Sequence, residues 1–265
     1  MSLALSSIRI YPVKSLGGIE VAEARTTDRG FEYDRRWMLV DASGRFITQR
    51  EQPTMALLRC AASATGFRVT DARNGDTIDL PWHIDGSRTF NAAVFDDTVR
   101  VLEVDPVWSA WFTERLGASA RLVFMPDSSQ RPVDARYADG ITSLSDGFPY
   151  LVVSQASLDD LNARMEVTLP MDRFRPNLVI SGGTAYQEDA WREVSIGAAR
   201  FTLVKPCGRC AITTTDQATG VRGKEPLRTL ATYRRRKGDE AKVDFGMNAM
   251  AEEGALVRVG DLVAP

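Results

Sequence analysis

Cysteine and histidine are scarce in this chain of 265 residues, which holds three cysteines (Cys60, Cys207 and Cys210) and one histidine, His83. So few thiols exclude a disulfide scaffold and favour an intracellular location. A single histidine excludes a His-rich metal site. Structural zinc usually takes four nitrogen or sulfur ligands, so it would need Cys60 and His83 beside the other two cysteines.

Long apolar runs and an excess of one charge are also missing. No run of 18 apolar residues occurs, and the N-terminus lacks a charged segment followed by a long apolar stretch, so neither membrane spanning nor secretion is predicted. Lysine and arginine total 33 against 35 acidic residues, a net charge of -2. This balance offers no large basic field for nucleic acid or an anionic membrane. We expect a cytoplasmic protein that binds neither.

Short β-type runs separated by turn signals dominate the first hundred residues. Asn74-Gly75 is a strong hairpin signal between two of these runs. The regular spacing predicts an antiparallel barrel or sandwich. The runs cover residues 8–13, 21–27, 35–40, 45–49, 67–72, 76–80 and 98–104.

The pattern changes at Asp105, where an N-cap, Pro106 and a later Gly117 predict a helix over 106–116. Ser157 and Asp160 resemble a capping box that opens a helix through about residue 165. A third helix is expected from about residue 225, with the basic residues 234–237 in its last turn. The polar stretch 127–146 is expected to be an irregular, functional loop. Further strands are predicted at 121–126, 150–154, 178–182, 191–197, 200–206 and 256–263. No strand and helix alternation typical of a parallel sheet is apparent.

The segment Cys207-Gly208-Arg209-Cys210 allows several interpretations. A zinc site lacks further ligands, and a thioredoxin-type dithiol would need a helix where β-branched residues follow. A third interpretation takes one cysteine as the single soft protein ligand of a transition metal whose other ligands come from a cofactor. Arg209 would then favour the ionised sulfur. The alternative is two buried, small apolar side chains on a strand.

Three other segments combine cations with hydrogen-bonding side chains. Lys14-Ser15 follows the first strand, Arg35 precedes a strand, and Arg175 stands two residues before Asn177. Lysine and arginine bind phosphate, and serine or asparagine adds neutral hydrogen bonds. Together these segments would bind a multiply charged phosphate, but singly each is more typical of a solvated surface charge. Their spacing does not show whether they converge.

Four motifs in order resemble the MOSC-domain family with its N-terminal MOSC β-barrel domain, and within it the amidoxime-reducing components and their bacterial counterparts. The motifs are YPVKS at 11–15, DRRW at 34–37, FRPN at 174–177, and C-x-R-C-x-x-T-T-x-D-x-x-T-G at 207–220. The resemblance covers about residues 8–263. It implies a mainly β fold with few helices, in which an N-terminal β-barrel domain (1–104) packs on a MOSC β-barrel domain (105–265) carrying the cofactor.

The resemblance implies a molybdenum cofactor, with Cys210 as the metal ligand and catalytic cysteine. It implies that the cofactor is bound by Lys14, Ser15, Arg35, Gly147, Phe148, Arg175, Asn177 and Arg209, and that Asp146 could take part in proton delivery. The expected reaction is reductive removal of oxygen from N-hydroxylated small molecules (hydroxylated base analogues, hydroxylamines or amidoximes), a detoxifying activity. No cysteine follows Cys210. Electrons are therefore expected from a separate flavoprotein or ferredoxin-type donor, and neither a [2Fe-2S] nor a sulfurase domain is expected.

Two other functions stay open. The chain could carry the cofactor without turning over a substrate, or it could be a β-barrel binding domain whose motif residues are structural. Outside the motifs, we expect Cys60 packed on a strand, His83 in a loop, and Trp108 and Trp111 on the core face of a helix. The basic run 234–237 is expected to be a solvated helix end, with docking of an acidic electron donor as the alternative.

Overall fold

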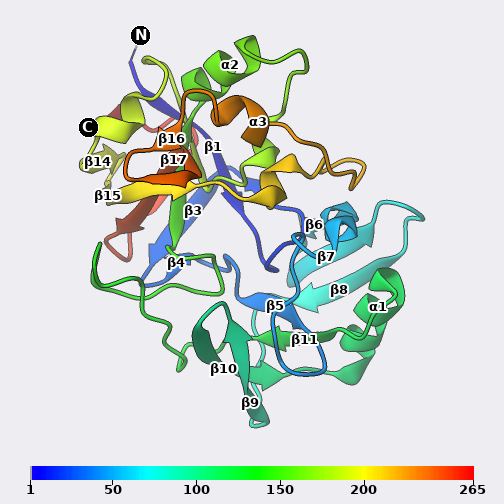
Figure 1. Cartoon of the computed structure of the whole chain (residues 1–265). Coiled ribbons are helices and arrows are strands. Elements are labelled where there is room, and N and C mark those ends of the chain that lie inside the picture. Colours follow the sequence, from blue (N-terminus) through cyan, green and yellow to red (C-terminus); the bar gives the residue numbers. More distant parts are fainter. Residues whose placement is uncertain (1) are drawn as a thin grey trace.

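The computed structural model describes residues 2–265, most of whose regular structure is strand (Figure 1). The expected mainly β fold with few helices is confirmed. The helices are α1 (Pro106–Leu116), α2 (Gln155–Ala163) and α3 (Leu227–Leu230), with the 3-10 turns η1 (Pro53–Leu57), η2 (Met171–Arg173), η3 (Gln187–Ala190) and η4 (Ala211–Thr214). The first strands are β1 (Ala4–Ile10), β2 (Ile19–Val21), β3 (Glu23–Thr27), β4 (Gly30–Phe31), β5 (Trp37–Val40), β6 (Leu58–Ala62), β7 (Gly66–Asp71), β8 (Thr77–Pro81), β9 (Thr89–Val94) and β10 (Asp97–Glu103). The remaining strands are β11 (Arg121–Phe124), β12 (Tyr150–Ser154), β13 (Leu178–Ser181), β14 (Glu193–Ile196), β15 (Ala199–Gly208), β16 (Arg235–Arg236), β17 (Asp239–Ala251), β18 (Leu256–Arg258) and β19 (Val263–Ala264).

A nine-stranded sheet joins the start of the chain to its second half. Its order is β19-β14-β15-β17-β12-β13-β1-β2, with β16 paired to β17. Three smaller sheets are ordered β5-β11-β10-β9, β18-β3-β4 and β6-β7-β8. Because β1 pairs with β13, residues 4–8 near the N-terminus lie beside residues 178–181 in the second half of the chain. The two halves thus share a sheet, and the domain boundary at 104 and 105 stays a prediction.

One parallel ladder departs from the expected antiparallel pattern. Strand β12 pairs in parallel with β13, and α2 provides the crossover between them. Antiparallel pairs flank this unit on both sides, where β17 pairs with β12 and β1 pairs with β13. A single strand-helix-strand unit inside an otherwise antiparallel sheet leaves no alternating pattern in the sequence.

Several strands were not predicted, among them β9 and β17, and one predicted strand is absent. The longest strand, β17, begins with exposed polar residues and crosses Gly246 at a φ of 76°, so it lacks a simple apolar alternation. Strand β9 has only two buried residues. In the predicted strand 45–49, only Arg45 and Phe46 form isolated bridges, to Ala93 and Val40.

The helices follow local capping rules only in part. Helix α1 confirms the prediction: Asp105 Oδ1 accepts from Val107 N at 2.9 Å, and Gly117 ends the helix at a φ of 62°. Helix α2 is capped by Ser154 rather than Ser157, because the Ser154 hydroxyl accepts from Ser157 N, and it ends at Ala163.

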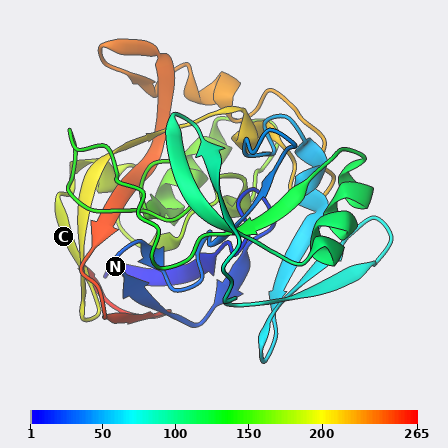
Figure 2. The same ribbon diagram turned by 90° about the horizontal axis from the view of Figure 1, so that it is seen from below.

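The third helix was overpredicted. It has only four residues, and Arg235 and Arg236 lie in strand β16. The basic run is therefore not a helix end. It belongs to the β16–β17 hairpin, which projects from the body of the molecule in Figure 2.

The main hydrophobic cluster spans both halves of the chain. The Trp37 ring, nearly fully buried, meets Phe67, Phe124 and Trp108 with ring centroids 6.2, 4.9 and 5.9 Å away. The same cluster includes Tyr150, whose ring meets Phe31. This shared core fixes the position of one half on the other.

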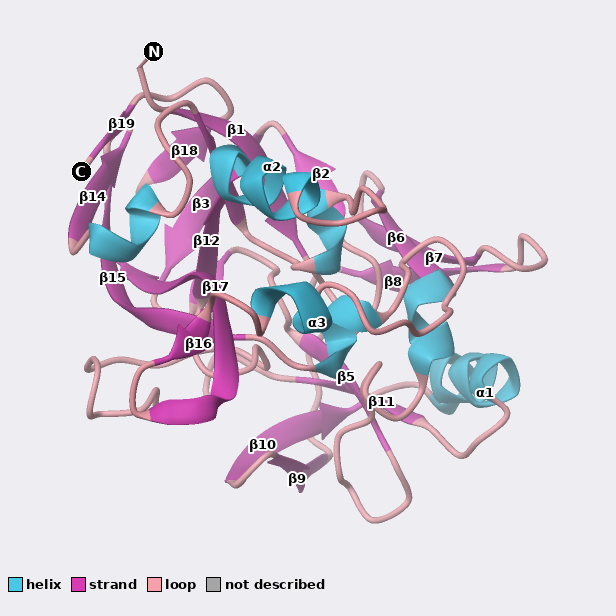
Figure 3. Cartoon of the chain, turned by 45° about the horizontal axis from the view of Figure 1, so that its top comes forward, coloured by secondary structure: helices cyan, strands magenta, loops and turns pink. Residues whose placement is uncertain are grey.

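The stretch 127–146 contains no helix or strand, as predicted, and runs between β11 and β12. Figure 3 shows that strands and loops make up most of the fold and helices little of it. Over the described part of the chain, no helix is long and apolar enough to cross a membrane.

Candidate functional site

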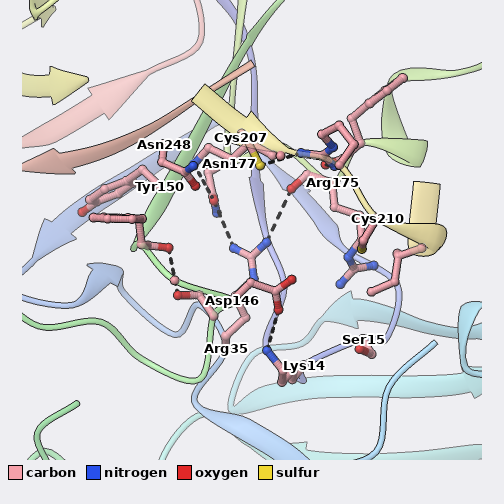
Figure 4. Close-up of a pocket in the computed structure, with 18 residues that line it drawn as sticks. Lys14, Ser15, Arg35, Asp146, Tyr150, Arg175, Asn177, Cys207, Cys210 and Asn248 are labelled. Carbon is pink, nitrogen blue, oxygen red and sulfur yellow. Dashed lines mark hydrogen bonds and ion pairs between the residues drawn. The ribbon is translucent and has the colours of Figure 1, made fainter. Parts of the chain in front are cut away.

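One pocket brings together all ten site residues named from the sequence (Figure 4). Strands end or begin at its wall: Lys14 follows β1, Arg35 precedes β5, and Arg175 precedes β13. The other seven are Ser15, Asp146, Gly147, Phe148, Asn177, Arg209 and Cys210. The lining also includes Ser145, Tyr150, Leu151, Phe174, Cys207, Gly208, Ile212 and, from the unpredicted strand β17, Asn248. Spacing could not show this convergence, which depends on the shared sheet.

Three of these residues adopt backbone conformations that side chains usually avoid. Ser15, Arg35 and Arg175 have φ values of 68°, 49° and 55°. The left-handed region costs roughly 1 kcal/mol for a residue with a Cβ, and such residues cluster at functional sites. Half of the six non-glycine residues with positive φ in the described chain line this pocket. The fold therefore maintains local strain here, which is typical of a binding site.

Lys14 and Asp146 form the first charged unit of the pocket. The nearly fully buried Lys14 Nζ donates to Asp146 Oδ1 at 2.7 Å and to the Leu144 carbonyl at 2.9 Å. Burial lowers the pKa of Lys14 to about 8, although Asp146 opposes this shift. The second carboxylate oxygen of Asp146 accepts from Arg50 Nη2 at 2.8 Å.

The two cations beside Asp146 favour the ionised form of its carboxyl group. Desolvation would raise the pKa of this carboxyl, but Lys14 and Arg50 outweigh it and hold the pKa far below its usual range. Its backbone is fixed by Arg131, whose guanidinium donates to the Ser145 and Asp146 carbonyls at 2.6 and 2.9 Å. An ionised carboxylate can position two cations, but it has no proton to donate.

Arg35 and Asn177 form the second unit. Arg35 Nη1 donates to Asp34 Oδ2 at 2.5 Å and to Asn177 Oδ1 at 3.0 Å. The buried Asn177 amide also accepts from Leu151 N at 3.3 Å and donates to the Arg9 carbonyl at 3.0 Å. Asn177 thus connects three segments of the chain and positions Arg35.

Arg175 has no acidic partner among residues 2–265. Its guanidinium stacks on the Tyr11 ring at 4.3 Å, and Arg35 stacks on the same ring at 4.4 Å. Burial lowers the pKa of Arg175 because it desolvates a cation that no carboxylate contacts. The pocket lining holds four cationic side chains (Lys14, Arg35, Arg175 and Arg209) against the single carboxylate of Asp146. This excess of positive charge suits an anionic ligand.

The two pocket cysteines have different cationic neighbours. Arg209 Nη1 donates to Cys207 Sγ at 3.0 Å, and Nη2 donates to the Phe174 carbonyl at 2.7 Å. The cation beside Cys210 is instead Arg50. Burial lowers the pKa of Arg50, but Asp146 and the Cys210 sulfur outweigh burial and raise it. Arg50 Nη1 is also buried without a hydrogen-bond partner.

Four residues that position the lining were not named as site residues from the sequence: Tyr11, Asp34, Arg50 and Arg131. Tyr11 and Asp34 belong to the quoted motifs YPVKS and DRRW, so the motifs were an available signal. Arg50 and Arg131 donate hydrogen bonds to Asp146 from positions 96 and 15 residues away in the sequence, and no local motif identifies them.

Neither conventional interpretation of the cysteine pair fits. Within residues 2–265, no three His, Cys, Asp or Glu side chains are grouped to hold a metal ion. Cys210 precedes the short 3-10 turn η4 rather than an α-helix. The three cysteines are free thiols. A metal on Cys210 would therefore need its other ligands from a bound group.

The residues expected to be structural lie outside the pocket. Cys60 is buried on β6, and burial raises the pKa of its thiol to about 12. His83 lies in a loop, half exposed, 3.3 Å from Asp85. Trp108 and Trp111 are partly buried against the main cluster.

Two family models match the chain: the MOSC N-terminal beta barrel domain over residues 2–119 and the MOSC domain over residues 139–264. The chain is 33% identical to the human mitochondrial amidoxime-reducing component 1 and 31% identical to the rat mitochondrial amidoxime reducing component 2. Each match covers 98% of this chain and 82% of the relative. It is also 34% identical to a rice molybdenum cofactor sulfurase, with 98% of this chain but 35% of that protein covered. The chain belongs to the MOSC-domain family that carries an N-terminal MOSC β-barrel domain, together with the mitochondrial amidoxime-reducing components.

Proposed function

We propose that the pocket binds a molybdenum cofactor through Cys210, and that the protein is an oxidoreductase that reduces N-hydroxylated compounds with electrons from a separate donor protein. The observation that carries this proposal is the gathering of two half-buried thiols and four cations in a single pocket. Family membership among amidoxime-reducing components and molybdenum cofactor sulfurases supports it.

The residues present fit such a group. The cofactor carries an anionic phosphate, and the pocket offers Arg175, which lacks an acidic partner, beside Lys14 and Arg35. The Nε atom of Arg209 and the Nη1 atom of Arg50 are buried without hydrogen-bond partners. Unsatisfied donors in a cationic pocket are explained when an anionic ligand accepts from them.

In this proposal Cys210 ligates the metal. Lys14, Ser15, Arg35, Arg175 and Asn177 hold the pterin and its phosphate or position the groups that do, Gly147 and Phe148 form one wall, and Arg209 lies beside the cysteine loop. When bound, the cofactor supplies a metal with open positions that exchanges two electrons and removes an oxygen atom from the substrate.

The pocket residues divide into a proton-holding group and a positioning group. Lys14, with a pKa of about 8, holds a proton at Nζ that can be exchanged near neutral pH. The sequence left proton delivery to Asp146 or solvent, and the pairing of the Asp146 carboxylate with Lys14 and Arg50 favours a positioning role for it. We assign proton delivery to Lys14 or solvent and a positioning role to Asp146.

The electron donor is proposed to be a flavoprotein or a ferredoxin-type protein. The β16–β17 hairpin rests on the cysteine loop, since Arg236 Nη2 donates to the Pro206 carbonyl at 3.1 Å and Arg209 N donates to the Val243 carbonyl at 2.8 Å. Lys237 and Arg235 on this hairpin are exposed. Exposed cations near the metal ligand would favour an acidic donor. Free thiols at Cys60, Cys207 and Cys210 agree with the proposed cytoplasmic location.

The experiment measures molybdenum and released pterin per chain after expression with molybdate. Wild type is expected to carry near-stoichiometric metal, and Cys210→Ser is expected to lose it. Cys207→Ser is the matched control, because Cys207 contacts Arg209 and should retain the metal. Loss of metal in Cys207→Ser alone, or no metal and no pterin in wild type, would contradict the proposal.

The alternative function is a cofactor carrier without turnover. Holo-protein reduced chemically and mixed with an amidoxime separates the two functions, because an oxidoreductase forms the amidine and a carrier does not. A protein with full metal content but no amidine, hydroxylamine or hydroxylated-base reduction would favour the carrier.

A further inference from the structure

A second cavity shares Arg175 with the cysteine pocket. Arg9, Tyr11 and Arg59 line it from the first half of the chain, and Asp172, Arg175 and Gln217 line it from the second. Of these residues only Arg175 also lines the cysteine pocket. Cavities between two packed halves are common ligand sites, and the proposed function gives this one no ligand.

Three guanidinium groups face this cavity with incomplete partners. Arg59, on β6, is exposed and makes no ion pair within residues 2–265, and Arg175 likewise has no acidic partner. Arg9 pairs through Nη2 with the exposed Glu20 at 3.1 Å, while its Nε is buried without a partner. The cavity therefore has strong hydrogen-bond donors that the protein leaves free.

One acidic group stands among these donors. Asp172 Oδ1 is buried and has no hydrogen-bond partner. Burial raises the pKa of Asp172, the charges of Arg9, Arg173 and Arg175 lower it, and Asp216 adds to the rise. Arg9, Asp172 and Arg175 line the same cavity. Three cations and one carboxylate leave a net charge of +2 on the lining. A carboxylate beside an anion is favourable only when the anion carries a proton that it can share.

The wall of the cavity is closely packed. Arg175 lies over the Tyr11 ring, and a Cβ at Gly18 would come within 2.5 Å of that ring. Gly17 N donates to the Leu58 carbonyl at 2.9 Å, and a Cβ at Gly17 would lie 3.1 Å from the Arg59 Cα. The Gly17-Gly18 pair thus lets the loop pass between Tyr11 and β6, so the cavity is formed without a ligand.

We propose that this cavity is a second anion-binding site, which holds a phosphate group between Arg9, Arg59 and Arg175 while a protonated phosphate oxygen donates to Asp172. Guanidinium groups match phosphate oxygens in geometry and charge. At neutral pH phosphate retains a proton and sulfate does not. The site therefore distinguishes two anions of similar size, and it shares Arg175 with the pocket of the proposed function.

The test is calorimetric titration of the full-length chain with inorganic phosphate and with sulfate at pH 7. Wild type is expected to bind phosphate at least tenfold more tightly than sulfate. Arg59→Gln is expected to weaken phosphate binding at least tenfold. Arg68→Gln, on the neighbouring strand β7 and paired only with Asp79, is the matched control and should leave binding unchanged.

Asp172→Asn tests the shared proton. The amide can donate to sulfate, so the variant is expected to lose most of the preference for phosphate. Because Arg59 is exposed, Arg59→Gln should unfold at the wild-type midpoint, which excludes loss of binding by misfolding.

Three results would overturn the proposal. The first is that wild type binds no phosphate, or binds it without saturation. The second is an equal loss of phosphate binding in Arg59→Gln and Arg68→Gln, which would indicate diffuse attraction. The third is loss of phosphate binding in Lys14→Gln but not in Arg59→Gln, which would place the anion in the cysteine pocket.

Discussion

Lys14 and Asp146 lie 132 residues apart in sequence, yet the Lys14 ammonium donates to the Asp146 carboxylate at 2.7 Å. The lysine side chain is 4% exposed and the aspartate side chain is 58% exposed. The ammonium also lies over the rings of Phe95 and Phe46, at 5.1 and 5.5 Å. The pair joins the end of the irregular stretch to the segment after β1 and so closes one side of the pocket.

Asp146→Asn should destabilise the protein, because it leaves Lys14 and Arg50 without their carboxylate. Breaking a fully buried pair costs about 3–5 kcal/mol, and solvent at the exposed Asp146 reduces the expected loss to about 1–2 kcal/mol. Urea unfolding at pH 7 measures it. Asp134→Asn, which removes only the surface pair with Arg136, is the control and should cost less than about 0.5 kcal/mol. An equal loss in both variants would contradict a special role for Asp146.

The same variant should change the pH dependence of stability. The pKa of Lys14 in the folded wild type is about 8, below its unfolded value of 10.5, so the unfolded state binds more protons between these values and stability rises with pH there. Without Asp146 the folded pKa falls further, and this rise begins below pH 8. The deficit of Asp146→Asn relative to wild type should therefore shrink from pH 6 to pH 8. A constant deficit would mean that Asp146 does not control the Lys14 proton.

Asn177→Ala should destabilise the protein even without a cofactor. The side chain is buried, and its amide serves Arg35, Leu151 N and the Arg9 carbonyl. Removing it leaves buried polar groups unsatisfied, at a cost of about 2–3 kcal/mol. Chemical unfolding of cofactor-free protein measures the loss. Asn74→Ala, in an exposed turn, is the control. Wild-type stability in Asn177→Ala would show that the amide acts on the ligand alone.

Substitution of Arg175 should change the stability of the protein little, whereas substitution of Arg173 should lower it. Arg175→Gly removes an unpaired cation and relieves a φ of 55°, so the free energy of unfolding should change by less than about 1 kcal/mol. Arg173→Ala breaks a buried pair with Asp216 at 2.8 Å and should cost about 2–3 kcal/mol. Metal content should nevertheless fall in Arg175→Gly. A large stability loss in that variant would assign Arg175 to the structure rather than to a ligand.

Native alkylation should separate the three cysteines. Burial raises the pKa of the Cys60 thiol to about 12, so at pH 8 this buried thiol is protonated and unreactive. Cys207 and Cys210 are half-buried and should react first with iodoacetamide in cofactor-free protein. Peptide mass spectrometry gives the rate at each site, and unfolded protein provides the reference. Equal native rates at Cys60 and Cys207 would contradict the burial of Cys60.

Local rules in the sequence were enough for much of the fold. The β-rich first half, helix α1 with its Asp105 cap and Gly117 stop, and the irregular stretch 127–146 all follow from residues that are neighbours in the chain. The site residues were also named one by one, because short motifs mark them. Strand β17 was missed because its residues are stabilised by β12 and β15, which pair with it from distant sequence positions.

The sequence by itself determined which residue types the site contains: two neighbouring thiols, several cations and few alternative metal ligands. Only the tertiary structure decided their partners. It placed Arg209 on Cys207 and Arg50 beside Cys210, and it paired Asp146 with Lys14, which lowers the pKa of the Asp146 carboxyl. The physical reason is that charge pairing and burial depend on distances in space, and here the shared sheet sets those distances across more than a hundred residues.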